Sequence, residues 1–419
     1  MKNNVVKNTT WLFIFQFAKI IFPFITLPYL TRVLTTDTYG VVTYVKTVMT
    51  YMQIFVDFGF VISGTKEIIN CLKSKNQKNL GFVVGDTMIA RIILGIIGYV
   101  VIVIVSLIIP ILRENLLFTI LSYTVVFESI FLMDFLFRGY EKMNVIAIRF
   151  ILMKVLSTVL TFVLIKDDSN VMLIPMLDII SSLIAIMLVM YEVGKLNIKF
   201  DTTDIKNIWS KLKDSFVYFL SNVASTSFNA LSTIIIGLYL SKAEIAYWGL
   251  CMQIVGTITA LYNPISDGIY PEMIKTKNIF LIKRSLKAFM PIVIAGCIFA
   301  YFFAEMGFRI LGGDNYLAAV PIFRMLIPML FFGFPAILFG WPVLGAINRQ
   351  KEVTITTILS VSFNILLLVL LIFTDSFTLI NISIVRVTTE FVLLLSRLIY
   401  YFKNKNEFVK GELSWKHQL

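Results

Sequence analysis

Residues 83–110 read VVGDTMIARIILGIIGYVVIVIVSLIIP, and they are the clearest guide to the architecture. After Arg91, residues 92–110 contain no charged side chain, and the apolar residues surround the helix axis instead of lining one face. A helix on a soluble core shows an apolar stripe, whereas a helix that is apolar all round is fully buried or faces lipid. About 20 apolar residues cross the hydrocarbon core of a bilayer. The stretch therefore predicts a transmembrane helix.

The rest of the chain repeats this pattern. Of its 419 residues, 58% are hydrophobic and 15% are charged, whereas soluble proteins have about 25% charged residues. Backbone groups find no water in hydrocarbon, so spanning segments form helices or closed barrels, and the alternating strands of a barrel do not occur. We expect an all-α polytopic membrane protein with about twelve spans. The predicted spans are 11–33, 40–62, 83–110, 116–137, 147–165, 171–191, 215–240, 244–268, 286–304, 318–345, 353–373 and 378–402.

The charges of the predicted loops indicate the orientation. Twelve spans place both termini on one side, and nearly all loop lysines and arginines lie on that side. The only basic residues in the predicted loops of the other side are Arg113, Lys166, Lys242 and Arg309. Because cytoplasmic loops carry the excess of basic residues, we expect both termini in the cytoplasm and the chain in the bacterial cytoplasmic (inner) membrane.

The longest predicted loop is basic and divides the spans six and six. Tyr39-Gly40 and Trp248-Gly249, near the starts of the second and eighth spans, are a trace of an internal repeat, as a two-lobe transporter would show. We expect the loop to lie near anionic headgroups. The predicted parts are an N-terminal six-helix lobe (1–191), a cytoplasmic basic linker loop (192–214), a C-terminal six-helix lobe (215–402) and a cytoplasmic tail (403–419).

Few residues are available for catalysis or metal binding. The single histidine is His417, and Cys71, Cys251 and Cys297 are far apart in sequence, which argues against a metal site and against histidine-dependent triads. We expect no catalytic residue, no metal, no cofactor and no enzymatic activity. A formal charge of +12 would suggest nucleic acid in a soluble protein, but here the charge lies in loops beside the membrane, so no nucleic acid is expected.

Two glycine motifs have ordinary explanations. The segment 59–66 resembles a phosphate loop, but it ends in Gly64-Thr65-Lys66-Glu67 instead of G-K-S/T and follows no strand, so a nucleotide site is not expected. Gly81-x3-Gly85 is a small-residue motif of the kind that packs helices together.

Longer motifs carry a resemblance to a known family. The stretch from Pro23 to Glu67 contains P-x4-P-Y-L-x-R-V-L, then Y-G, then D-F-G-F-x-x-S-G-T-K-E, and R-G-Y-E-K-M follows the fourth span at 138–143. In these motifs, in length and in span count, the chain resembles the polysaccharide flippase family of the multidrug/oligosaccharidyl-lipid/polysaccharide exporter superfamily. The resemblance implies two lobes around a central cavity and alternating access.

The same resemblance implies a substrate and partners. The substrate would be undecaprenyl diphosphate bearing a short oligosaccharide, moved to the outer leaflet for O-antigen, lipopolysaccharide or capsule synthesis. Membrane lipid, a proton or sodium ion for coupling, and a polysaccharide polymerase would be the partners.

Cations deep in the predicted spans are the candidates for binding that diphosphate. A charged side chain at the centre of a span costs about 2.5–3.5 kcal/mol, so its presence calls for an explanation. Lys19, Lys46, Arg91 and Lys154 all belong to the N-terminal half, and a diphosphate needs positive charge and several donors. In the alternative interpretation, neighbouring acids neutralise these cations, which then only hold helices together.

Four deep carboxylates are candidates for ion coupling: Asp57, Glu128, Asp178 and Glu390. Arg386 lies one helical turn before Glu390, and we expect these two to form an intrahelical ion pair. Charged residues near the span edges are expected to snorkel toward water. These are Arg32, Asp86, Asp134, Arg149, Lys287 and Arg397.

The tenth predicted span has a proline every seven residues, at Pro321, Pro328, Pro335 and Pro342. Each removes a backbone donor and frees a carbonyl, which favours a bent or hinged gating helix. The alternative is simple packing, since proline is common in membrane helices.

Two rival functions follow from the same pattern. A drug or metabolite exporter of the same superfamily should have acids dominating its cavity, whereas the deep bases here match or outnumber the acids. A membrane glycosyltransferase or polymerase should have a large outer loop for catalysis, and the predicted outer loops are very short.

Overall fold

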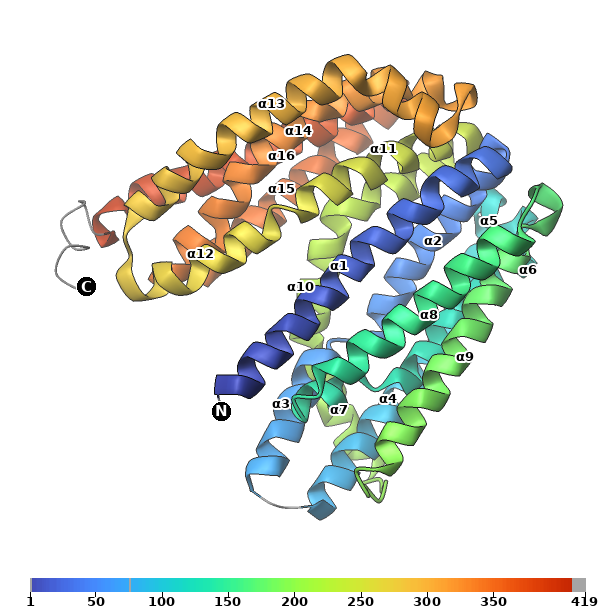
Figure 1. The fold of residues 1–419 in the computed structure, drawn as a ribbon, viewed down its shortest axis with the longest axis vertical. Coiled ribbons are helices and arrows are strands. Elements are labelled where there is room, and N and C mark those ends of the chain that lie inside the picture. The colour runs from blue at the N-terminus through green and yellow to red at the C-terminus, as the bar shows by residue number, and fades with distance from the viewer. Residues whose placement is uncertain (1, 75–76, 409–419) are drawn as a thin grey trace. The chain divides into compact units, whose positions relative to one another are not determined.

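The computed structural model describes residues 2–74 and 77–408, and every regular element in this part of the chain is a helix (Figure 1). The α-helices are α1 (Lys2–Val33), α2 (Thr36–Asp57), α3 (Phe60–Lys73), α4 (Gln77–Ile108), α5 (Pro110–Glu114), α6 (Leu116–Glu128), α7 (Asp134–Gly139), α8 (Met143–Leu164), α9 (Leu173–Gly194), α10 (Ile205–Tyr239), α11 (Lys242–Ala260), α12 (Asn263–Thr276), α13 (Ile279–Gly312), α14 (Val320–Leu338), α15 (Gln350–Phe373) and α16 (Leu379–Lys403).

Eleven helical stretches of the described residues are long and apolar enough to cross a membrane. Each coincides with one of the predicted spans, so the all-α polytopic architecture is confirmed. The remaining predicted span, 215–240, lies in α10, where Ala230–Tyr239 is the apolar segment found among the described residues. Lys211, Lys213 and Asp214 make the helix more polar near the predicted start of that span.

Contacts divide the chain into two compact units. Unit 1 comprises Met1–Thr226 and Thr233–Ile245, and unit 2 comprises Ser227–Ser232 and Ala246–Leu419. Unit 1 therefore contains most of α10, whereas the predicted division at residue 214 assigns all of the seventh span to the C-terminal lobe.

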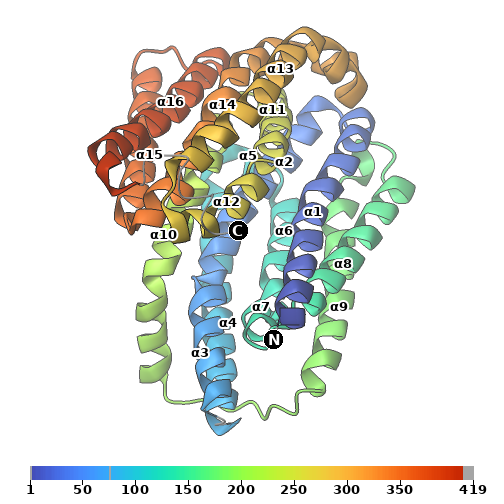
Figure 2. The ribbon, with the colours of Figure 1, turned by 60° about the vertical axis from the view of Figure 1, so that its left-hand side comes forward.

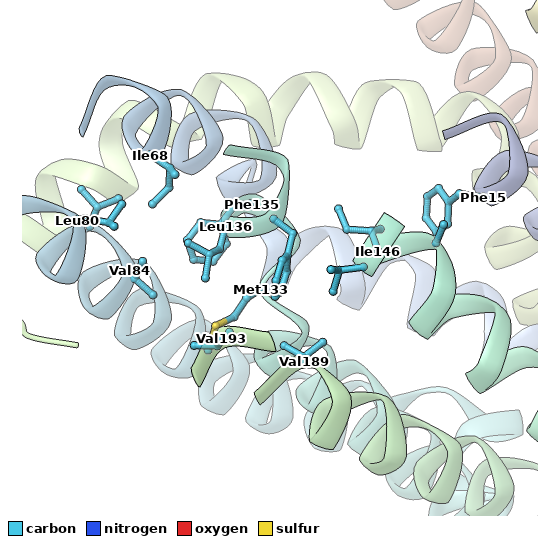
Figure 3. Close-up of a cluster of buried hydrophobic side chains, with 14 residues drawn as sticks. Phe15, Ile68, Leu80, Val84, Met133, Phe135, Leu136, Ile146, Val189 and Val193 are labelled. Atoms are coloured by element: carbon cyan, nitrogen blue, oxygen red, sulfur yellow. The ribbon is translucent and has the colours of Figure 1, made fainter. Parts of the chain in front are cut away.

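Within unit 1, α1 packs against α8, α8 against α9, and α9 against α6, which also contacts α2 and α4. Figures 1 and 2 both show α1, α8 and α9 side by side. A buried apolar cluster joins α7 and α8 to parts of α1, α3, α4 and α9. Figure 3 shows Phe15 at one end of this cluster, Leu80 and Ile68 at the other, and Phe135 and Leu136 of α7 between them. This cluster fixes the short helix α7 inside the unit.

The second predicted span, 40–62, is broken between α2 and α3. Phe58 and Gly59 both have positive φ, 43° and 80°, a conformation that glycine tolerates and other residues rarely adopt. The ring of Phe58 stacks on Phe219 of α10, with centroids 4.6 Å apart. Gly59 has no space for a Cβ because Tyr218 lies against it. The break is thus held by α10.

The remaining residues of the phosphate-loop-like segment serve packing as well. Gly64 lies against the ring of Phe135, and the Thr65 hydroxyl donates to the Phe135 carbonyl at 3.2 Å. Ser63 and Ser215 of α10 share a hydrogen bond of 2.7 Å.

The segment 195–204, which connects α9 to α10, is called the linker below. Figure 2 shows it running along the lower edge of the view between the ends of α9 and α10. The carbonyl oxygens of Lys199 and Asp201 lie where side chains on Gly81 and Gly85 of α4 would stand. The prediction that this glycine motif packs a helix is wrong, because the missing side chains admit an extended chain instead.

Within unit 2, α14 packs against α13 and α16, and α15 packs against α16 (Figure 1). The predicted span 318–345 contains a break. A π-helical turn, Phe339–Leu344, follows α14, and Gly340 has a non-helical ψ of −112°.

The four prolines of this span occupy different surroundings. Pro321 lies in the first turn of α14, Pro328 and Pro335 lie within the helix, and Pro342 lies in the π-helical turn. The break at Gly340 falls between the last two prolines, and a hinge there remains a prediction.

Candidate functional site

Arg91 of α4 and Asp57 at the end of α2 form a hydrogen-bonded ion pair, with 2.5 Å between Nη2 and Oδ1. Arg91 is 3% exposed, and its Nη1 also donates to the Ile130 carbonyl at 3.3 Å. A buried guanidinium requires such partners. The Asp57 side chain stays 26% exposed. Arg91 therefore fits the alternative interpretation, in which a neighbouring acid neutralises the cation.

Arg149 of α8 and Asp134 of α7 form a second ion pair. The prediction that Arg149 snorkels at a span edge is wrong, since it is 5% exposed. It lies in the second turn of α8, and its ion pair connects α8 to α7. It is close enough to Arg91 for the two charges to repel. The two ion pairs are thus electrostatic neighbours.

Lys19 of α1 is exposed, and its ammonium group lies 4.4 Å from the centroid of the Phe15 ring. Phe15 is itself anchored edge-on against Phe150, with centroids 5.0 Å apart. Among the described residues, no carboxylate lies within ion-pair distance of Lys19. The charges that act on it are those of Arg138 and Asp57.

Arg138 is the functional candidate that sequence reasoning missed, because it was expected in a cytoplasmic loop. It lies in the last turn of α7, whose Phe135, Leu136 and Phe137 are fully buried. Its Nε is buried without a hydrogen-bond partner, and it forms no ion pair with the residues described. The R-G-Y-E-K-M motif was the available signal. Lys19 and Arg138 are thus neighbouring cations, and no carboxylate in the described part of the chain contacts either of them.

Lys46 and Lys154 belong to a separate group around Asp178 of α9. Lys154 lies 3.8 Å from the Asp178 carboxylate, which accepts a hydrogen bond of 2.7 Å from Ser157. Lys46 is exposed and interacts electrostatically with Asp178 and Lys154. The four predicted cations therefore divide into two groups, Lys19 with Arg91 and Lys46 with Lys154. The second group has two cations for one carboxylate, Asp178.

The four carboxylates predicted for ion coupling have unequal surroundings. Asp57, Asp178 and Glu390 each face a cation. Glu128 of α6 is buried, interacts with Ser182, and keeps one carboxylate oxygen without a hydrogen-bond partner. Among the described residues it is the carboxylate of this set without an ion pair.

The polar residues of α16 lie in the interior of unit 2. Arg386 and Glu390 form the predicted intrahelical ion pair, 3.6 Å apart. Arg397 was predicted to snorkel, but it is buried and donates to the Ala336 carbonyl at 2.6 Å. It also lies against Gly340. Arg397 thus satisfies a carbonyl of α14 next to the helix break.

Asp86 is a third residue for which the prediction of snorkelling toward water is wrong. It is 1% exposed and accepts two hydrogen bonds from Thr203 of the linker, from the amide at 2.8 Å and from the hydroxyl at 2.9 Å. Lys211 lies 3.4 Å from Asp86 and 3.1 Å from Glu67. Periodicity could not reveal this role, because the partner lies more than a hundred residues away.

Comparison with known proteins places these observations in a family. Residues 5–277 match the family described as "Polysaccharide biosynthesis protein". Two proteins named "Putative O-antigen transporter" are similar over long stretches. The one from Escherichia coli (strain K12) is 24% identical and covers 96% of this chain and 98% of its own length. The one from Shigella dysenteriae is 26% identical and covers 65% of this chain and 68% of its own.

Solved structures share the fold. The lipid II flippase MurJ in an inward closed conformation has a TM-score of 0.70 at 14% identity, covering 97% of this chain and 94% of its own. An inward-facing multidrug resistance MATE family transporter of the MOP superfamily has a TM-score of 0.65 at 13% identity. The match covers 91% of this chain and 98% of the transporter. The family match extends over more than half of the chain, and the relatives agree with it. This multi-pass membrane protein therefore belongs to the polysaccharide biosynthesis protein family.

Proposed function

We propose that the protein is a flippase that moves lipid-linked oligosaccharides, with polyprenyl diphosphate as the lipid carrier, from the cytoplasmic to the outer leaflet of the inner membrane. The observation that carries this proposal is the excess of cations over carboxylates in unit 1. Lys19, Arg91, Arg138 and Arg149 are matched by two acids, and Lys46 and Lys154 by one. The names of the relatives and the family match support the same function.

The sign of the excess charge suits the headgroup. A diphosphate must leave water while its sugars cross, and two unit charges 4 Å apart attract by about 4 kcal/mol at an effective dielectric near 20. Lys19 and Arg138 are the cations best placed to supply this attraction, since neither forms an ion pair with a carboxylate within residues 2–74 and 77–408. Arg91 acts indirectly, because its ion pair neutralises Asp57, a carboxylate whose charge acts on Lys19. Transport of this kind forms no covalent bond, so the protein needs no catalytic residue.

A drug exporter with a cationic substrate fits these surroundings less well. It would need carboxylates free to bind the substrate, whereas Asp57, Asp134 and Asp178 all face cations of the protein. Glu128 remains available for a coupling proton or sodium ion. Both termini are placed in the cytoplasm by the positive-inside rule.

Complementation of a deletion strain tests the proposal. We expect loss of the gene to abolish surface polysaccharide, and Lys19→Ala and Arg91→Ala each to do the same while the protein accumulates in the membrane. Lys19→Arg and Arg91→Lys should keep part of the activity because they keep the charge. Arg113→Gln, which removes an exposed arginine far from both groups, is the matched control. Normal polysaccharide from the Lys19→Ala/Arg91→Ala double variant would refute the diphosphate site.

Variants of the Arg91–Asp57 ion pair show whether Arg91 contacts the substrate or only neutralises Asp57. If Arg91 serves only to neutralise Asp57, then Asp57→Asn should restore activity to Arg91→Gln, because the buried charge is removed from both sides. If Arg91 also contacts the substrate, the double variant should stay inactive.

A further inference from the structure

The first half of α10, residues 205–220, has two faces. One face is docked on α3 and α4, where Ile208 is 4% exposed and packs with Phe60, Ala90 and Leu94. Lys211 on this face lies 3.1 Å from Glu67 of α3. These contacts hold the helix in a fixed rotation about its own axis.

The opposite face is apolar and exposed. Ile205 is 83% exposed, Trp209 72% and Val217 70%. Phe216 and Leu220 are also exposed. At about 100° per residue these five side chains fall within a stripe roughly 120° wide, whose centre lies about 120° from Ile208 around the helix axis.

Two lysines lie in the same stripe. Lys206 and Lys213 are exposed and are spaced by seven residues, so they project within about 20° of each other and fall inside the stripe. Apolar rings interleaved with cations are characteristic of a helix that lies at the boundary between lipid and water.

The contacts of α10 with α4 place this stripe at the cytoplasmic boundary. Ile208 packs with Ala90 and Leu94, and Lys211 lies 3.4 Å from Asp86. The first turns of α10 therefore lie beside the cytoplasmic end of the predicted span 83–110. The stripe from Ile205 to Leu220 begins at the level of the headgroups and continues along the adjoining acyl chains.

We propose that this stripe binds anionic phospholipid of the cytoplasmic leaflet. Trp209 and Phe216 lie against the acyl chains below the headgroups, and Lys206 and Lys213 contact the phosphates. Each lysine near an anionic surface strengthens binding by about fivefold. This proposal relies on the cytoplasmic orientation of the start of α10, but it does not depend on transport. The lipid-binding proposal can therefore be refuted while the proposed flippase function stands.

Fluorescence quenching by brominated lipids tests the site in the intact protein. The full chain is reconstituted into bilayers of phosphatidylcholine and phosphatidylglycerol, with the bromine carried by the acyl chains of one lipid at a time. The difference between the natural chain and Trp209→Phe isolates the signal of Trp209 and leaves the buried Trp248 untouched. We expect Trp209 to be quenched more strongly by brominated phosphatidylglycerol than by an equal fraction of brominated phosphatidylcholine.

Charge variants determine whether the lysines cause the preference. Lys206→Gln/Lys213→Gln should reduce the preference for phosphatidylglycerol roughly tenfold or more at low salt. Lys195→Gln is the matched control, because Lys195 is ion-paired with Glu192 outside the stripe. Equal quenching by both lipids in the natural chain would overturn the anionic site. Absence of quenching by either would mean that water or another protein covers this face, and would overturn the proposal altogether.

Discussion

Asp86→Ala tests how the linker is held against α4. Asp86 is nearly inaccessible to water, and it accepts two hydrogen bonds from Thr203 and faces the ammonium group of Lys211. A hydrogen bond to a charged group contributes about 1.5–3 kcal/mol. The linker regains water when it detaches, so we take the lower value for each bond, about 3 kcal/mol in total. The population of detached linker should then rise by roughly a hundredfold, at about 1.4 kcal/mol per factor of ten.

Hydrogen exchange of the linker amides, followed by mass spectrometry of the protein in lipid, measures this population. We expect residues 195–204 to exchange about a hundredfold faster in Asp86→Ala. Asp86→Asn keeps an acceptor for Thr203 but loses the charge, so its effect should be intermediate. Asp214→Ala, which removes an exposed carboxylate of α10, is the control. Unchanged exchange in Asp86→Ala would show that the glycine contacts alone hold the linker, and would refute the reasoning.

Three further predictions concern single residues. Gly85→Val should destabilise unit 1 by about 1–3 kcal/mol, because its side chain meets the Asp201 carbonyl; a melting temperature equal to that of Gly296→Val, where nothing lies within 4 Å, would contradict it. Glu128→Gln should slow transport and remove its dependence on a proton or sodium gradient, as measured by flux into vesicles; an unchanged dependence would exclude this carboxylate. Arg138→Gln should lower surface polysaccharide strongly and Arg138→Lys weakly, and a normal level in both would remove Arg138 from the site.

The spans could be predicted from the sequence because a bilayer requires only a continuous run of about 20 apolar residues, which can be read along the chain. A run of apolar residues such as 83–110 must be helical wherever it lies, since no water is present to bond its backbone. The ion pair of Arg386 and Glu390 could be predicted for a similar reason, because both members lie on one helix at a spacing fixed by its pitch.

The partners of the other charges depend on contacts between distant segments. Nothing in the sequence around Asp86 indicates that Thr203 will bond it, and the depth of Arg149 is set by α7, which turns back into the unit. The glycines of α4 show the same limit, since a small-residue spacing permits close approach but does not say whether a helix or an extended chain will approach. Which cations are neutralised was therefore decided by tertiary packing, because ion pairing requires atoms within a few ångströms and that distance is a property of the fold.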